Sequence, residues 1–256
     1  MQTIFNRKIA DSYKNNSQKI RVLTEAWVKN EIFCPNCGSI ISEYENNKPV
    51  GDFYCQNCSE DYELKSKKKS MGKKIVDGAY STMIQRLKSQ KNPNFFFLNY
   101  DLKNYEIINF AVIPKHFFIP EIIEKRKPLS KNARRAGWVG CNILLQSIPQ
   151  SGKVFYIKDR KKEDKNQILK NWKKTLFLRE QQKTELRGWT LDIMKCIDKL
   201  NKKEFNLNEV YDFKNMLRCK YPKNKHIEDK IRQQLQFLRD EGYLKFINPG
   251  KYKLTE

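Results

Sequence analysis

The chain lacks any apolar run that approaches the roughly 20 residues a helix needs to cross a bilayer. Its first residues, Met1 to Lys8, also lack the apolar core of a secretory signal peptide. Acidic residues are scarce, because 29 Asp and Glu face 51 Lys and Arg, which gives a net charge of +22. These features argue against a membrane-spanning protein and predict a cytoplasmic one whose partner carries dense negative charge.

Nucleic acid is the partner that this charge favours, because a phosphate backbone attracts many distributed Lys and Arg side chains. A membrane surface is the weaker alternative, since the basic residues are not concentrated on one amphipathic helix. Hydrophobic residues make up 39% of the chain and aromatic residues 12%, which is typical of a folded protein. The 256 residues suffice for two small domains or one large one.

Seven cysteines in a reducing compartment argue against disulfides. Four of them form two pairs at the same spacing, Cys34 with Cys37 and Cys55 with Cys58. Each pair closes a tight turn around one side of a metal ion, and Gly38 relieves the first turn. Four thiolates favour Zn²⁺, and a site filled entirely by protein predicts a structural zinc. A redox-active pair is less favoured, because two copies are present and neither opens a βαβ helix.

The second cysteine pair lies between two short segments, 52–54 and 62–65, in which polar and apolar residues alternate. This alternation predicts two strands joined as a hairpin. Glu63 and Lys65 share one face of their strand, and Asp52 is expected opposite one of them. Two carboxylates and a lysine are typical of a Mg²⁺-dependent phosphodiesterase, because the cation relieves their repulsion and the lysine positions or activates water. The alternative is a surface hairpin whose charges face solvent.

Two other segments have the composition of a DNA contact. A basic, flexible run that includes Lys67 and Lys68 is interpreted either as a solvated loop or as a grip on phosphates near the hairpin. Arg134 and Arg135 precede Trp138, which is flanked by glycines. This tryptophan is interpreted either as part of the core or as the tip of a loop that stacks on a base.

Periodicity predicts the remaining elements. Helices are expected at residues 17–30 (with Ser17 as N-cap), 75–89, 163–179, 189–200, 207–220 and 226–240, and strands at 94–100, 105–113, 153–158 and in a hairpin over 242–254. Residues 114–131 are expected to be irregular. The fold class is therefore α/β, with a mixed-sheet domain that carries an inserted zinc ribbon over residues 1–181. Three helices and a hairpin predict a winged helix-turn-helix domain over residues 182–256.

The third helix of this second domain is expected to enter the major groove with its N-terminal polar residues nearest the base edges. The alternative for the domain is a helical protein-interaction module. The residues of this helix expected to face DNA are His226, Lys230, Arg232, Gln233 and Gln234.

Several long segments resemble one known family, and they are dispersed over both predicted domains. They are Leu23-Thr24-Glu25-x-Trp27, Cys34–Gly38, Asp52–Cys55, Glu63–Lys67, Asp77–Tyr80, Asn92–Leu98, Ala133–Trp138 and Lys230–Leu235. The sequence resembles the DpnI-type methyl-directed restriction endonucleases of the PD-(D/E)xK superfamily, across essentially its whole length. One departure is that Gly51 stands where the superfamily motif has a proline before its first acid.

The resemblance implies Mg²⁺-dependent cleavage of double-stranded DNA at 5′-GATC-3′ when the adenine carries an N6-methyl group. It implies that Asp52, Glu63 and the Leu64 carbonyl hold Mg²⁺, that Lys65 assists the attacking water, and that the four cysteines hold zinc. Trp138 would lie against the adenine methyl groups, both domains would read the site independently, and the protein is expected to be a monomer. The alternative is a non-catalytic zinc-ribbon and winged-helix DNA-binding regulator, which leaves the two acids and the lysine without a role.

DNA binding is predicted to weaken steeply with salt. If about six phosphates are contacted, the affinity should fall roughly 10³-fold or more between about 50 and 200 mM salt, because each contact releases condensed counterions. Fluorescence anisotropy with a labelled duplex at several salt concentrations measures this slope. A flat salt profile would contradict the nucleic-acid interpretation.

Overall fold

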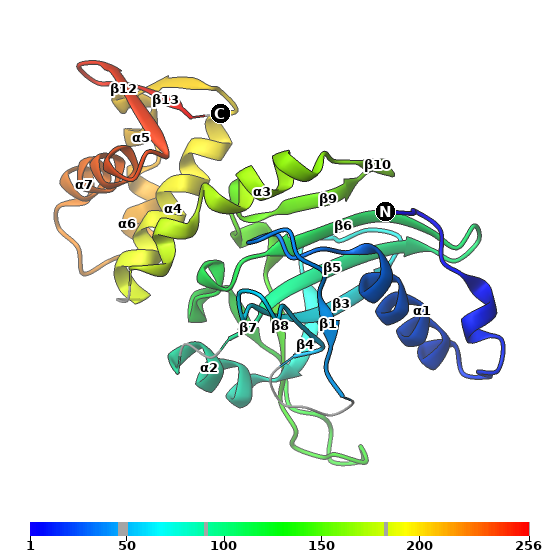
Figure 1. Ribbon diagram of the computed structural model, residues 1–256. Helices are drawn as coiled ribbons and strands as arrows, with labels where there is room; N and C mark the ends of the chain where they lie inside the picture. Colours follow the sequence, from blue (N-terminus) through cyan, green and yellow to red (C-terminus); the bar gives the residue numbers. More distant parts are fainter. Residues whose placement is uncertain (46–50, 90–91, 182–183, 256) are drawn as a thin grey trace. The chain divides into compact units, whose positions relative to one another are not determined.

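The computed structural model describes residues 1–45, 51–89, 92–181 and 184–255. The chain forms two compact units (Figure 1). The first unit contains Met1–Gln146 and Ser151–Lys173, and the second contains Ser147–Gln150 and Lys174–Glu256. None of the helices within the described ranges is long and apolar enough to cross a bilayer.

The first unit is built around a seven-stranded sheet in the order β1-β2-β3-β5-β6-β9-β10 (Figure 1). Its strands are β1 (Ser42–Glu43), β2 (Phe53–Tyr54), β3 (Asp61–Lys68), β5 (Asn94–Asp101), β6 (Glu106–Ile113), β9 (Val154–Lys158) and β10 (Lys161–Lys162). β3 and β5 are parallel, and every other neighbouring pair is antiparallel. The predicted mixed α/β fold and the strands expected at 94–100, 105–113 and 153–158 are confirmed.

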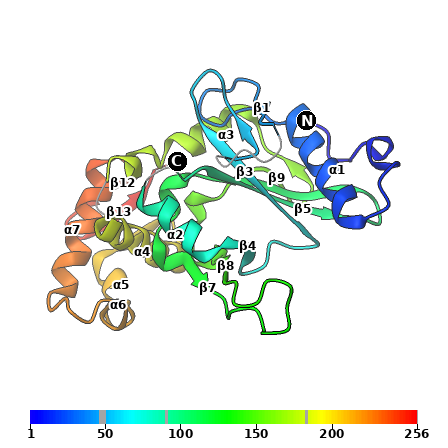
Figure 2. The ribbon, with the colours of Figure 1, turned by 90° about the horizontal axis from the view of Figure 1, so that it is seen from below.

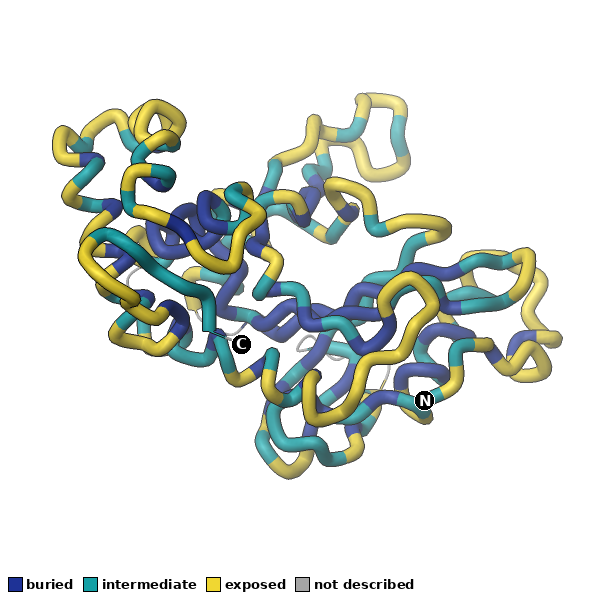
Figure 3. Tube along the Cα trace, turned by 90° about the horizontal axis from the view of Figure 1, so that it is seen from above, coloured by how far each residue is buried: buried dark blue, intermediate teal, exposed yellow. Residues whose placement is uncertain are grey.

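Aromatic side chains form the core of this unit. The ring of Tyr62 stacks on that of Phe96 with centroids 4.5 Å apart, and Phe96 in turn contacts Phe110 at 5.1 Å. Trp27 of α1 (Asn16–Glu31) packs edge-on against Phe110, also at 5.1 Å, so α1 covers this face of the sheet. Figure 3 shows the exposed positions gathering on outer loops, while the interior trace is buried. Such burial of large rings is the main stabilising contribution to the sheet.

The helix α1 begins close to its predicted start but is capped by a different residue. The Asn15 side chain accepts a hydrogen bond from the Ser17 N–H at 2.8 Å, so Asn15 is the N-cap and the prediction of Ser17 is wrong. Both residue types cap helices well, and the sequence alone did not separate them.

A second, three-stranded sheet in the first unit has the order β4-β8-β7 and lies beside α2 (Figure 2). Its strands are β4 (Ile75–Ala79), β7 (Ile123–Lys125) and β8 (Gly140–Ile143), and α2 spans Tyr80–Lys88. The prediction of one helix over 75–89 is therefore wrong for its first five residues. Antiparallel pairing with β8, from much later in the chain, stabilises β4 as a strand. The strand β7 likewise interrupts the segment 114–131 that was expected to be irregular.

The predicted helix over 163–179 is shorter than expected. α3 spans Lys165–Lys173, and a separate 3-10 turn, Leu176–Arg179, follows it in the second unit.

Over its described residues, the second unit combines four α-helices with a small sheet. The helices are α4 (Thr184–Leu200), α5 (Leu207–Tyr211), α6 (Lys214–Lys220) and α7 (Ile227–Asp240), and the sheet β11-β13-β12 contains β11 (Glu204–Asn206), β12 (Leu244–Asn248) and β13 (Lys251–Leu254). The predicted C-terminal hairpin is confirmed, and β11 adds a third strand to it. The single helix predicted over 207–220 is two helices, with a turn at Asp212 and Phe213.

The glycine at position 51 accounts for the missing proline of the superfamily motif. A Cβ atom at Gly51 would lie 2.8 Å from the Tyr62 carbonyl oxygen, which is closer than a side chain tolerates. The same oxygen accepts the Asp52 N–H at 2.9 Å. Glycine is therefore required for β2 to approach β3 at the point where Asp52 is placed.

Gly51→Ala is expected to lower the free energy of unfolding by about 1–3 kcal/mol, because the added methyl group displaces the backbone of β3. Gly78→Ala is the matched control, since no atom lies within 4 Å of a Cβ built there. Urea denaturation of both variants measures the difference. Equal stability of the two variants would contradict the close approach at Gly51.

Candidate functional site

The hairpin β2–β3 places the first pair of predicted site residues together. Phe53 lies opposite Tyr62, and this register is extended by the bond from the Asp52 N–H to the Tyr62 carbonyl. Asp52 therefore lies beside Glu63, and its carboxylate accepts the Leu64 N–H at 2.7 Å. The predicted hairpin is confirmed, and Tyr62, on the other face of β3 from Glu63 and Lys65, is fully buried.

Lys65 lies between two carboxylates. Its Nζ is 2.5 Å from Oε1 of Glu63 and 2.5 Å from Oδ1 of Asp77. The second oxygen of Glu63, Oε2, is 3.0 Å from Nη1 of Arg86. These mostly buried side chains come from β3, β4 and α2 and form a continuous row of alternating charge.

Asp77 and Arg86 were not predicted as site residues. Asp77 lies in a segment that was predicted to be helical, and its position on β4 depends on pairing with β8. Arg86 lies near the end of α2, where a basic residue is typical of an ordinary helix C-terminus. The only earlier signal was the segment that begins at Asp77, which carried part of the family resemblance.

The electrostatics of the site favour a bound cation. Burial raises the pKa of Asp52, the Leu64 hydrogen bond opposes this, and the charge of Glu63 raises it further, so the net shift is upward. Burial lowers the pKa of Lys65, but Glu63 and Asp77 outweigh it and the net shift is upward, so the amine stays an ammonium. Neighbouring carboxylates repel one another, and a divalent ion bound between them would reduce this repulsion.

The helix α1 supplies a further charged pair near Asp52. Nε of Arg21 is 2.8 Å from Oε1 of Glu25. Burial raises the pKa of Glu25, the hydrogen bond and charge of Arg21 lower it, and the charge of Asp52 adds to the rise. The field at Asp52 therefore depends on α1 as well as on the hairpin.

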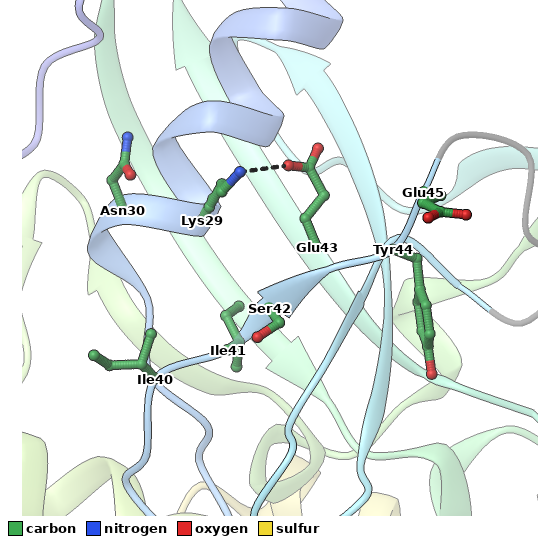
Figure 4. Close-up of a pocket in the computed structure, with 8 residues that line it drawn as sticks. All are labelled: Lys29, Asn30, Ile40, Ile41, Ser42, Glu43, Tyr44 and Glu45. Carbon is green, nitrogen blue, oxygen red and sulfur yellow. Dashed lines mark hydrogen bonds and ion pairs between the residues drawn. The ribbon is translucent and has the colours of Figure 1, made fainter.

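A separate open cavity of about 620 Å³ lies at the C-terminal end of α1, beside β1 (Figure 4). It is lined by Lys29, Asn30, Ile40, Ile41, Ser42, Glu43, Tyr44 and Glu45. Lys29 pairs with Glu43 at 3.2 Å, and Glu45 adds a second carboxylate (Figure 4). This lining does not suit phosphate, and none of the predicted site residues belongs to it.

The four paired cysteines converge as predicted. Their sulfur atoms all lie within 4.8 Å of one another, with Cys34 Sγ 3.4 Å from Cys58 Sγ and Cys37 Sγ 3.5 Å from Cys55 Sγ. Tetrahedral zinc with bonds of about 2.3 Å requires sulfur atoms roughly 3.8 Å apart. The cluster fits that requirement and indicates a structural zinc site.

The two cysteine turns share one backbone design. The Gly38 N–H donates to the Cys34 carbonyl at 2.8 Å, and the Ser59 N–H donates to the Cys55 carbonyl at the same distance. Gly38 and Ser59 both adopt the left-handed region, with φ of 78° and 56°. The sequence predicted that Gly38 relieves the first turn. Because Ser59 occupies the corresponding position of the second turn, the sequence alone did not show that both turns have the same backbone conformation.

The cluster is connected directly to β3. The Tyr62 hydroxyl lies 3.1 Å from Cys34 Sγ, and Tyr62 directly precedes Glu63. Burial raises the pKa of the Cys34 thiol. Burial also raises the pKa of Cys37, but hydrogen bonds, first from Ser39, outweigh it and lower this pKa to about 6. A cysteine with such a pKa is already a thiolate at neutral pH, which favours metal binding.

The basic run after Lys65 begins as a strand rather than as a loop. β3 continues to Lys68, which is exposed. Lys67 folds back, with its Nζ 3.5 Å from the carbonyl oxygens of Met71 and Lys74. The expectation of a flexible run is therefore wrong for its first residues.

Arg134, Arg135 and Trp138 lie in the loop that joins β7 to β8. The Arg135 guanidinium lies 4.4 Å from the centre of the Trp138 ring. The indole also lies over Gly140, where an added Cβ would lie 2.8 Å from two ring carbons. Trp138 is only half-buried and lies in this loop, so the interpretation as a core tryptophan is wrong, while contact with a base stays a prediction.

Most of the residues predicted to face DNA on α7 are accessible. His226, Arg232 and Gln233 are exposed and Lys230 is half-buried. Nζ of Lys230 donates to Oε1 of Gln233 at 2.7 Å, so these two side chains share one face.

Gln234 is a correction to the predicted DNA-facing set. Its side chain is 3% exposed and accepts a hydrogen bond from Oγ1 of Thr190 at 2.6 Å. It lies on the inward face because it is seven positions after Ile227 and three after Ile231, both of which are buried. Gln234 therefore packs inside the second unit.

The mixed sheet, the four-cysteine site and the C-terminal helical unit define an α/β protein with an acidic, lysine-containing site. Residues 1–181 match the DpnI family, described as the Dam-replacing family. Residues 185–254 match the DpnI_C family, described as the Dam-replacing HTH domain. The chain therefore belongs to the DpnI family. Membership points to a restriction endonuclease, and the helix-turn-helix domain points to DNA binding.

The cysteine cluster predicts one zinc ion per chain and a large effect of its loss. Cys37→Ser is expected to lose the metal and to lower Tm by about 10 °C or more. A structural metal binds the folded chain and not the unfolded one, so its loss removes that binding free energy from the stability of the fold. Cys219→Ser is the control, since Cys219 is exposed and lies outside the cluster. Elemental analysis and thermal melting measure both effects. Full metal content and an unchanged Tm in Cys37→Ser would contradict the assignment.

Proposed function

We propose that the protein is a type II, methyl-directed restriction endonuclease. It cleaves double-stranded DNA at 5′-GATC-3′ when the adenine carries an N6-methyl group. Family membership of both parts of the chain supports this proposal. The observation that carries it is the position of Lys65, held between two carboxylates beside Asp52. A protein that only binds DNA would leave Asp52, and the two carboxylates that hold Lys65, without a role.

Asp52, Glu63 and the Leu64 carbonyl would hold Mg²⁺. All three offer oxygen, which is the ligand this small, hard cation prefers. The three carboxylates of Asp52, Glu63 and Asp77 lie with two cations, Lys65 and Arg86, so this group of described side chains keeps a net negative charge that fits a divalent ion. Bound there, Mg²⁺ would supply Lewis-acid polarisation of the phosphate and a more acidic water.

Lys65 would orient the attacking water and stabilise negative charge on the phosphate. Its ammonium is fixed by two ion pairs, so little rearrangement is needed when DNA binds. The water oxygen forms a bond to phosphorus while the phosphorus–oxygen bond to the leaving strand end breaks. Hydrolysis of one phosphodiester bond in each strand then gives the double-strand break.

The β7–β8 loop would read the methylated base in the domain formed by residues 1–181. Trp138 presents a half-buried ring that Arg135 and Gly140 hold in place, which suits contact with the adenine methyl groups. Arg134 is exposed on the same loop and would bind backbone phosphate.

The remaining basic residues would complete the DNA contact. Lys67 and Lys68 follow the active-site residues on β3 and would bind phosphates near the cleaved bond. In the domain formed by residues 182–256, α7 would lie in the major groove of a methylated site. Its contacts would come from His226, Lys230, Arg232 and Gln233.

Asp52→Asn and Lys65→Ala are expected to lower the cleavage rate of adenine-methylated plasmid in Mg²⁺ by about 10²-fold or more. Both variants should still bind the duplex, because Lys67, Lys68 and the other basic residues proposed to contact DNA remain. Asp159→Asn is the control, since Asp159 is exposed in a turn with φ of 48°, a conformation that asparagine accepts. Parental cleavage by either site variant would contradict the catalytic assignment.

The substrate is tested by digestion of one plasmid prepared with and without adenine methylation, followed by fragment mapping. Fragments that end at GATC only in the methylated preparation are expected. Equal cleavage of both preparations would contradict methyl dependence. Intact DNA in both, with binding retained, would favour the non-catalytic regulator.

A further inference from the structure

Asp77 is the most buried member of the charged row around Lys65. Its side chain is 8% exposed, and its Oδ1 lies 2.5 Å from Nζ of Lys65. That distance equals the one between Lys65 and Glu63, so the amine is held equally from two sides. The two anchors come from different sheets, since Glu63 belongs to β3 and Asp77 to β4.

Glu63 is already engaged through both of its oxygens. Oε1 contacts Lys65, and Oε2 contacts Arg86 at 3.0 Å. The proposed function requires the same carboxylate to hold a divalent ion, which competes with these cations for its oxygens. Asp77 is not among the proposed metal ligands, so no metal ion would compete with Lys65 for its oxygens.

Asp77 is also fixed by the strand that carries it. It pairs with Cys141 of β8, and the pairing shifts between Asp77 and Ala79, so that Ala79 lies opposite Gly140. Gly140 is the residue on which the Trp138 ring rests. The anchor of Lys65 and the residue that supports Trp138 are therefore neighbouring positions of two paired strands, β4 and β8.

We propose that Asp77 is the positioning residue for Lys65. It holds the ammonium at the reaction site when Glu63 turns to the metal, and it places that ammonium relative to the sheet that carries Trp138. This inference rests on the proposed endonuclease function. It adds a residue that acts through Lys65 and touches neither DNA nor metal.

The first test uses Asp77→Asn, which keeps the size of the side chain and removes its charge. We expect kcat for cleavage of methylated DNA to fall about 10²-fold, which is a typical cost of misplacing a reacting group by about 1 Å. KM and the duplex Kd should stay within a few-fold of the parental values, since Asp77 contacts no ligand. An unchanged kcat, or a loss confined to KM, would overturn the proposal.

The second test needs neither metal nor DNA. Amine-selective labelling followed by mass spectrometry measures the reactivity of Lys65 in the metal-free protein. Asp77→Asn should raise the labelling rate of Lys65 several-fold, while Lys74, which pairs with Glu124, should keep its rate. The Asp159→Asn variant should leave both rates unchanged. No selective change at Lys65 would show that Asp77 has only a general structural role.

Asp77→Glu keeps the negative charge and covers the case in which Asp77→Asn does not fold. It should keep the labelling rate of Lys65 low and retain more of kcat than any neutral variant at this position. High labelling of Lys65 in Asp77→Glu would overturn the proposal.

The two tests separate this inference from the proposed function. If the parental protein fails to cut methylated DNA, the proposed function fails, while the labelling result still reports the pair of Lys65 and Asp77. If the parental protein cuts and Asp77→Asn cuts equally well, the function stands and the role of Asp77 fails.

Discussion

The four-cysteine cluster is the constraint on which the acidic site depends. Cys55 and Cys58 lie in the connection between β2 and β3, so a metal held by all four thiolates fixes the hairpin that brings Asp52 beside Glu63. The contact between Tyr62 and Cys34 extends this constraint into β3 itself. Without the constraint from the cysteine cluster, a two-residue strand such as β2 has few hydrogen bonds to hold its register against β3.

Charge is organised differently at the site and over the rest of the chain. The protein carries a net charge of +22, which favours a phosphate backbone, yet its acidic site keeps more carboxylates than cations. The positive charge of the chain suits a phosphate backbone as partner, and the excess of carboxylates at the site suits a divalent ion. Lys65 and Arg86 lower the repulsion among the carboxylates.

The sequence predicted the features that depend on neighbours in the chain. The cysteine spacing, the hairpin around Glu63 and the strands 94–100 and 105–113 are local patterns, and the structure confirms them. The strand β4 was missed because its partner β8 lies far along the chain, and the position of Asp77 beside Lys65 was missed with it. Gln234 was misassigned because a polar residue on an inward face is satisfied by a partner on another helix, Thr190.

The central claim is that a metal-clamped hairpin brings two carboxylates to one divalent ion beside a fixed lysine. Crystals of the protein soaked with Mn²⁺ test this claim most directly, because manganese gives an anomalous signal at a defined position. The account predicts an anomalous peak bridged by Asp52 and Glu63, with Lys65 still paired to Asp77. Diverging carboxylates with no ion between them would contradict it.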